Sequence, residues 1–241
     1  MVSLIQKAPE AGAVHITLRF RYEKRGALAY VSHLDILRTM TKALIRAGLP
    51  LYYSEGFSPH PKLSFAAPLP VSQESVCEYF DVRLASPYDP AVAMAALNAT
   101  LPPDLRILAA GYPACKFTAV GSARYLITLK TAGADDALAA KCAALLSQKP
   151  LTVFKRSKAG DRDVDVSGSI LSVTASYEEG AIRLFVTLRA EGGAFLNTDY
   201  LLTYLRDKAG ILSGSPLEES ACVMRLALYD TAGEEIAEAT E

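Results

Sequence analysis

Apolar and polar residues alternate between His15 and Tyr22, and this is the first clear pattern in the chain. A period of two predicts a strand with one side in the core and one polar side. The side expected in the core carries Ile16, Leu18, Phe20 and Tyr22. The other side carries His15, Thr17, Arg19 and Arg21, so we expect this strand to have a basic face.

A helix is predicted next, with signals at both ends. Ser32 is a good N-cap, and Asp35 three residues later resembles a capping box and favours the positive end of the helix dipole. Gly48 and Pro50 end the helix. Its core side is expected to carry Leu34, Leu37, Thr41, Leu44 and Ala47. Another side carries a basic stripe of residues spaced four apart, namely Arg38, Lys42 and Arg46.

The segment from Ser54 to Lys62 contains Gly56, Pro59 and Pro61. Such a segment cannot form a helix or a central strand, so we predict a shaped loop. Strands are predicted over 63–71 and 78–84, then an alanine-rich helix over 89–101 and a strand over 105–108. This β-α-β-β-α-β order is that of a ferredoxin-like domain.

The same order recurs in the second half. Strands are predicted over 125–129, 170–177, 182–188 and 222–228, with a helix from 135 and another capped by Asn197 or Thr198 and ended by Gly210. We therefore predict an α+β fold of two tandem ferredoxin-like (βαββαβ) halves with antiparallel sheets. Residues 1–14 are expected to form an N-terminal tail, 15–112 the first half, 113–230 the second half, and 231–241 an acidic C-terminal tail.

The composition is that of a folded protein. Of the 241 residues, 51% are hydrophobic and 21% are charged, which excludes a disordered or fibrous chain. The sequence has no apolar run long enough to span a membrane, and its first fourteen residues lack the apolar stretch of a secretory signal. The four cysteines lie far apart, which argues against a disulfide scaffold. We expect a cytoplasmic protein with no membrane contact.

The charge is distributed unevenly, although the formal net charge is only −1. Between His15 and Phe65 there are eight basic and three acidic residues, whereas from Leu217 onward there are seven acidic residues and only Arg225 is basic. A basic N-terminal region suits an anionic partner. A solvated surface that is merely basic remains the alternative.

Common catalytic motifs are missing from the sequence. It contains no P-loop, no GxGxxG, no GxSxG and no HExxH, and its three histidines do not form a metal-ligand pattern. We expect no metal and no cofactor. The remaining acid/base candidates are His33, Asp35 and His60, but the ends of the intervening helix lie about 20 Å apart, so the two histidines meet only if the loop folds back. The alternative roles are a polar first-turn residue for His33 and a helix cap for Asp35.

A nucleic-acid surface is the second candidate site. Arginines that contact phosphates beside aromatics that stack on bases are typical of sheet faces that bind single-stranded RNA. The alternative is that the two halves bury these faces against each other. In the second half such a face is expected to carry Arg183, Phe185 and Arg189. In the first half the candidate substrate-binding residues are Arg19, Arg21, Arg38, Lys42, Phe57, Lys62, Tyr79 and Arg83.

Several runs resemble a known family. The segments 20–26 (FRYEKRG), 30–35 (YVSHLD), 46–50 (RAGLP) and 56–65 (GFSPHPKLSF) are similar to the radical-SAM-associated domain family, whose biochemical function is not established. The resemblance covers about residues 15 to 110. Members of this family look like stand-alone proteins or like extensions of radical SAM proteins that carry a cobalamin-binding domain. The resemblance therefore implies a radical SAM protein as partner. The chain has no CxxxCxxC to hold an iron–sulfur cluster.

The leading hypothesis is therefore a non-catalytic accessory that binds RNA or presents a substrate to a radical SAM modification enzyme. The first alternative is an enzyme acting on RNA or another anionic substrate with His33, Asp35 and His60 as acid/base groups. The second alternative is a protein–protein interaction module.

Overall fold

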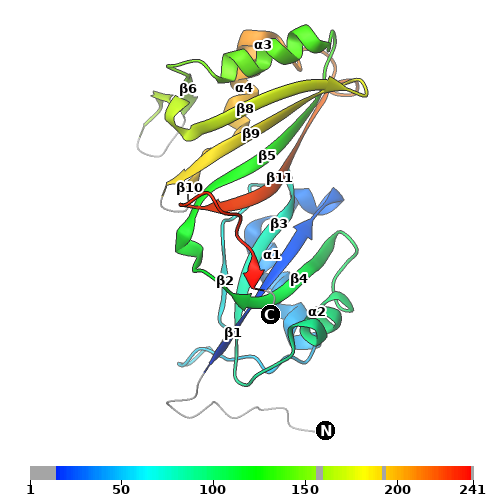
Figure 1. Cartoon of the computed structure of the whole chain (residues 1–241). Helices are drawn as coiled ribbons and strands as arrows, with labels where there is room; N and C mark the ends of the chain where they lie inside the picture. The colour runs from blue at the N-terminus through cyan, green and yellow to red at the C-terminus, as the bar shows by residue number, and fades with distance from the viewer. Residues whose placement is uncertain (1–14, 156–159, 192–193, 240–241) are drawn as a thin grey trace. The chain divides into compact units, whose positions relative to one another are not determined.

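The computed structural model describes residues 15–155, 160–191 and 194–239 (Figure 1). They form two compact units. The first unit takes residues from 15–68, 78–117 and 237–239, and the second takes 69–77 and 118–236. The fold is mixed α+β with mostly antiparallel strands, as predicted.

The first unit is a sheet with two helices. Its sheet has the strand order β2-β3-β1-β4-β12. The elements are β1 (Ile16–Lys24), a 3-10 helix (Gly26–Tyr30), α1 (His33–Arg46), β2 (Leu63–Phe65), β3 (Gln73–Leu84), α2 (Pro90–Asn98), β4 (Leu105–Pro113) and β12 (Glu238–Ala239). Strand β4 is antiparallel to β1, and β2 is antiparallel to β3.

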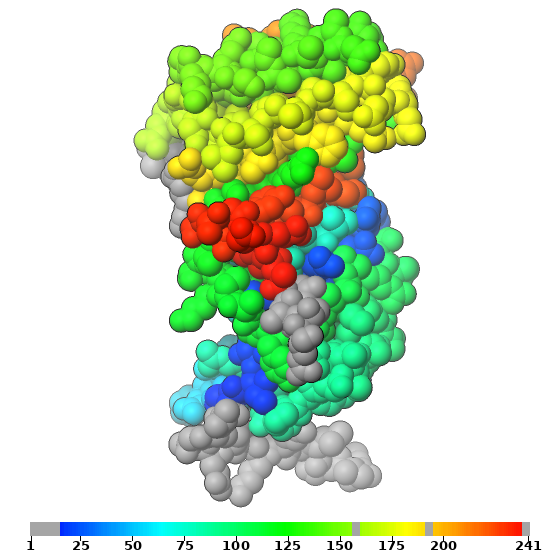
Figure 2. Space-filling view, viewed as in Figure 1, coloured from blue at the N-terminus to red at the C-terminus, as the bar shows by residue number. Residues whose placement is uncertain are grey.

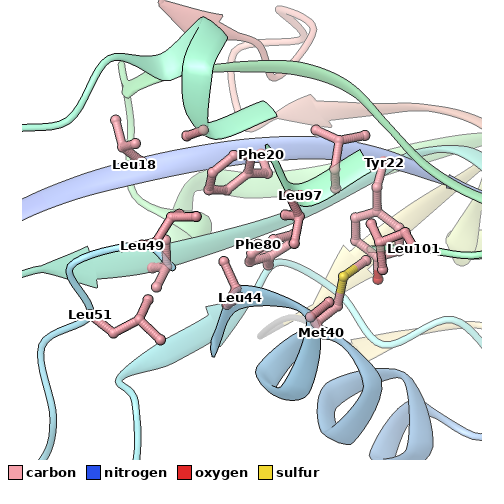
Figure 3. Packing of buried hydrophobic residues seen from close by; sticks show 14 of the residues in the cluster. Leu18, Phe20, Tyr22, Met40, Leu44, Leu49, Leu51, Phe80, Leu97 and Leu101 are labelled. Carbon is pink, nitrogen blue, oxygen red and sulfur yellow. The ribbon is translucent and has the colours of Figure 1, made fainter. Parts of the chain in front are cut away.

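The core of this unit lies between the helices and one face of the sheet. Phe20 of β1 and Phe80 of β3 stack with their ring centroids 5.1 Å apart (Figure 3). Met40 and Leu44 of α1 pack in the same cluster, together with Leu97 of α2. Leu18, Phe20 and Tyr22 are all buried, so the predicted apolar side of the first strand is confirmed.

The ends of α1 are confirmed, whereas its predicted core side is confirmed only in part: Leu44 is buried and Ala47 packs against the core, but Leu34 is not buried. Ser32 accepts a hydrogen bond from the Asp35 amide, and the helix ends before Gly48. Leu34 was expected in the core, yet 62% of its surface is exposed. The residues that α1 buries are Ile36, Met40, Ala43 and Leu44. This second set also has helical spacing, and it is the set that faces the sheet.

The second unit has a sheet of order β8-β9-β5-β11, to which the short β10 adds beside β9. Residues Gln73–Ser75 of β3 pair in parallel with Val223–Arg225 of β11. Helix α4 is capped by Asn197, one of the two predicted caps, and ends at Gly210, whose φ is +77°. The elements are β5 (Val120–Lys130), α3 (Asp136–Leu146), β6 (Thr152–Lys155), β7 (Arg162–Asp165), β8 (Ile170–Glu178), β9 (Ala181–Glu191), β10 (Ala194–Phe195), α4 (Thr198–Ala209) and β11 (Ser220–Asp230).

The predicted C-terminal tail requires correction. Within 231–241, Ile236 is buried, because an apolar side chain of this size gains by leaving water. Glu238 and Ala239 form β12, which pairs with Pro113 and Tyr112 of β4. The chain crosses between the units at 68/69, 77/78, 117/118 and 236/237, and of these only 117/118 lies near the expected boundary of 112/113. The expected N-terminal tail, 1–14, lies outside the described residues.

None of the helices in the described ranges is long and apolar enough to cross a membrane.

Candidate nucleic-acid interface

The predicted loop is closed at its base by Ser54 and His60. The Ser54 amide donates to the His60 carbonyl at 2.8 Å, and the His60 amide donates to Ser54 Oγ at 3.1 Å. Ser54 Oγ also lies 2.9 Å from His60 Nδ1. Gly56 has a φ of +118°, a conformation that side-chain-bearing residues rarely adopt. These contacts hold the turn in one shape.

Phe57 lies at the tip of this loop, and its side chain is fully exposed. Burying a phenylalanine gains roughly 1.5–3 kcal/mol, so a chain usually covers it when it can. The neighbouring Gly56 and Ser58 are also exposed, and neither is large enough to cover the ring. Phe57 therefore presents an aromatic ring to solvent and to any partner.

Lys62 and Arg83 lie directly opposite each other beyond the loop. The Arg83 amide donates to the Lys62 carbonyl at 3.0 Å, and the adjacent residues Leu63 and Val82 are paired in register. Residues directly opposite in an antiparallel pair point to the same face of the sheet. Both side chains are exposed, and within the described ranges neither forms an ion pair.

An aromatic ring lies beside Lys62. The Lys62 ammonium lies 5.6 Å from the centre of the Tyr52 ring, and the His15 ring lies 3.8 Å from the same ring. His60 is exposed two residues before Lys62, while the intervening Pro61 is buried. We call Phe57, His60, Lys62 and Arg83 the loop surface. In Figures 1 and 2 the loop that carries Phe57 and His60 is light blue and lies beside the start of β1. It offers cations and an aromatic ring on one edge of the first unit.

The expected open face at the centre of the sheet is wrong, because Arg19 is 0% exposed and Tyr79 only 1%. Arg19 donates to both carboxylate oxygens of Asp81, at 2.8 and 3.0 Å, and to the Cys115 carbonyl at 2.8 Å. Its guanidinium also lies 4.1 Å from the centre of the Phe117 ring. The segment after β4 thus covers this part of the sheet, and Arg21 beside it is half-buried.

The three acid/base candidates have separate partners. His33 packs edge-on against Phe65 of β2, with ring centroids 5.1 Å apart, whereas His60 precedes β2 by three residues and bonds within its loop. Asp35 accepts hydrogen bonds from Ser32 and Arg38, at 2.7 and 2.9 Å, and these bonds lower its pKa. Among the described contacts, no hydrogen bond joins any two of the three.

Two charged residues near His33 were missed by the sequence analysis. Lys24 is 2% exposed, and its ammonium donates to the carbonyls of Ala29 and Val31 at 3.2 and 3.0 Å; Glu78 is 4% exposed. Burial lowers the pKa of His33, the Glu78 carboxylate raises it, and Lys24 lowers it. In the sequence, Lys24 stands at the end of the alternating strand. Charged residues are rarely buried, so this position did not predict the burial of Lys24.

The other predicted cations differ in their surroundings. Arg38 is engaged with Asp35, whereas Lys42 and Arg46 are exposed on α1 without an ion pair in the described part of the chain. In the second unit, Arg183 pairs with Glu178 and Glu179. Arg189 is exposed, and the half-buried Phe185 ring lies 5.2 Å from the Arg124 guanidinium. Among these second-unit cations, Arg183 is neutralised by two carboxylates, whereas Arg189 is exposed without an ion pair in the described ranges.

A hollow and a metal-binding cluster are two other features of the described residues that would bear on a site. A hollow of about 710 Å³ lies between the start of α2 and β4, lined by residues that include Tyr88, Met94, Leu108 and Tyr112, and it contains none of the predicted site residues. Across the described residues, no group of three or more His, Cys, Asp or Glu side chains is arranged to hold a metal ion.

Residues 17–197 match a family model described as "Uncharacterized protein conserved in bacteria (DUF2344)". No curated protein matches the chain.

Two solved structures are similar in part. One belongs to a Cbf5-Nop10-Gar1 complex, with 9% identity and a TM-score of 0.44 over 87% of this chain and 49% of that one. This chain thus spans about half the length of that protein. The other is an unknown protein from Galdieria sulphuraria, with 10% identity and a TM-score of 0.25 over 88% of this chain and 99% of that one. At these scores neither carries an argument about function.

Proposed function

The chain belongs to this bacterial family (DUF2344), and we propose that it acts as a non-catalytic accessory that binds RNA through the loop surface and presents it to a radical SAM modification enzyme. The enzyme partner rests on the sequence resemblance alone. A cytoplasmic location also stays a prediction.

The observation that carries the RNA proposal is the pairing of Lys62 with Arg83. Two exposed cations share one face of the sheet edge, and neither is neutralised by a carboxylate in the described ranges. Phosphates are bound by cations of this kind, because each contact releases a condensed counterion. Lys42 and Arg46 on α1 add further exposed positive charge to the same unit.

We also propose that each unit is a ferredoxin-like domain. The orders β2-β3-β1-β4 and β8-β9-β5-β11 both place the first strand of the unit between its third and fourth strands. Two helices alternate with the strands in each unit, as the βαββαβ order requires. In the second unit the β6–β7 hairpin is an insertion after the first helix.

The test is the salt dependence of RNA binding. A Lys62→Ala/Arg83→Ala variant should bind RNA more weakly, and the slope of log affinity against log salt should fall by about two if each side chain contacts one phosphate. A Lys130→Ala/Arg206→Ala variant is the matched control, because it removes two exposed charges from the second unit.

The proposal fails if the two variants behave alike or if the wild type binds no RNA at low salt. The second result would favour a protein partner, since the burial of Arg19 and Tyr79 already removes the expected open sheet face.

A further inference from the structure

We infer that the loop surface takes unpaired nucleotides, and that the Phe57 ring stacks on a base while Lys62 and Arg83 hold the backbone. This inference rests on the proposed function and names its substrate class. It is carried by the exposure of Phe57, by the fixed shape of its loop and by the cations at the base of that loop.

The ring of Phe57 is free on the protein surface. Its side chain is fully exposed, and among the described residues it has no aromatic or cationic partner. Gly56 before it has no side chain, and Ser58 after it is small. A flat ligand can therefore approach the ring without displacing a neighbouring side chain.

The backbone of the loop is held in one shape before a ligand arrives. Ser54 and His60 close its base through both backbone and side-chain hydrogen bonds, and His60 Nδ1 lies 3.3 Å from the Ser58 carbonyl within the loop. Pro59 and Pro61 fix the backbone on both sides of His60. Binding then costs little loop ordering, which is the advantage of a preorganised site.

The neighbouring charges favour a nucleic acid over an apolar protein surface. Beyond Phe57, the loop surface consists of His60, Lys62 and Arg83, which are all exposed and basic or titratable. An apolar partner would have to desolvate these side chains without pairing them. A nucleotide supplies both a flat base and a phosphate.

A duplex would not satisfy the same arrangement. Each internal base of a double helix is already stacked above and below, so the ring reaches a base face only after unstacking, which costs energy. With a duplex, only Lys62 and Arg83 would make contact, through the phosphates, and the Phe57 ring would not. The Phe57 ring is therefore the feature that favours single-stranded RNA over duplex RNA.

The test compares a single-stranded 12-nucleotide oligouridylate with a 12-base-pair RNA duplex by fluorescence anisotropy. Phe57→Ala should weaken binding of the single strand by roughly 5- to 100-fold, the range that loss of one stacked base gives, with the salt slope unchanged. Phe57→Tyr keeps the ring and should bind like the wild type. Duplex binding should be the same for all three proteins. Because Phe57 is fully exposed, its replacement should leave the fold intact, which circular dichroism checks.

The two proposals fail in different ways. If Phe57→Ala binds the single strand like the wild type while Lys62→Ala/Arg83→Ala does not, the stacking inference is wrong and RNA binding stands. If Phe57→Ala weakens single-strand and duplex binding equally, selectivity for unpaired nucleotides is wrong. If neither variant changes RNA binding, both proposals are overturned.

Discussion

Arg19 and Asp81 form a two-point ion pair between strands β1 and β3. Arg19 Nε donates to Oδ1 at 2.8 Å, and Nη2 donates to Oδ2 at 3.0 Å. The arginine side chain is fully buried, and 14% of the aspartate side chain is exposed. A guanidinium in such a position is tolerated only while its donors are satisfied, so this pair ties the integrity of the first unit to one carboxylate.

Asp81→Asn should therefore destabilise the first unit strongly. The substitution leaves a buried positive charge without its counter-ion, for which a loss of about 3–5 kcal/mol is typical. Urea unfolding followed by far-UV circular dichroism measures the change. Glu23→Gln is the control, because its partner Arg25 is partly exposed and surface pairs contribute only about 0–1 kcal/mol. Equal effects of the two substitutions would contradict the structural role of the buried pair.

Glu219 should make the second unit sensitive to acid. Its carboxylate accepts hydrogen bonds from the Ala132 amide, the Thr131 hydroxyl and the Gly214 amide, and these bonds lower its pKa. A carboxyl whose pKa is lower in the folded state stabilises the fold above its unfolded pKa of about 4.3, and this stabilisation is lost as the pH falls further. Glu219→Gln should lower the denaturation midpoint at pH 7 and flatten its dependence on pH below about 4.3.

Glu218→Gln is the matched control, since Glu218 is exposed one residue away. A Glu219→Gln protein with the wild-type acid profile would show that the hydrogen bonds to this carboxylate do not stabilise the folded state.

The pKa of His33 should lie below the ordinary value for histidine. Burial is the main cause of its lowered pKa, with opposing effects from Glu78 and Lys24. The folded state thus prefers the neutral ring, so its contribution to stability is present above the unfolded pKa of about 6.5 and is lost as the pH falls through the lower folded value. NMR titration of the imidazole carbon-bound protons measures this directly, with His33→Gln to assign the resonance. A titration midpoint at or above 6.5 would contradict the described burial.

Glu55 should weaken RNA binding, since it is an exposed acid two residues before Phe57. At a separation of about 8 Å in water, repulsion between this carboxylate and a phosphate is roughly 0.5 kcal/mol, a two- to threefold effect on affinity. Glu55→Gln should therefore strengthen binding at low salt and have little effect at high salt, where the charge is screened. Glu235→Gln, an exposed acid in the second unit, should leave binding unchanged. Weaker binding by Glu55→Gln would show that Glu55 contacts the RNA itself.

Local signals were sufficient for the helix ends. Ser32 caps α1 as predicted, and Asn197, one of the two predicted caps, caps α4, because a cap depends on a side chain and the backbone within three residues. The side that α1 buries was not predictable in the same way. Its two apolar sets both have helical spacing and share Leu44, so only packing against the sheet selects between them.

The candidate site shows the same division between local and distant causes. The loop and its residues Phe57, Lys62 and His60 were predicted from prolines and glycine close in the sequence. The burial of Arg19 depends on Asp81 and on the segment at Cys115, which lie 62 and 96 residues away. Strand alternation indicates which side chains share a face, but it does not indicate which later segment will cover that face.

Because the segments of the two units alternate along the chain, neither unit is synthesised as one continuous stretch. The first unit receives β12 only after the second unit has left the ribosome, and the second unit takes residues 69–77 long before the rest of it is made. Domains generally fold as units during synthesis. Here neither unit has all its strands while the chain is still short, and no single cut of the backbone releases either one whole. An expression fragment ending at residue 117 would therefore lack a strand of the very unit that it was meant to isolate.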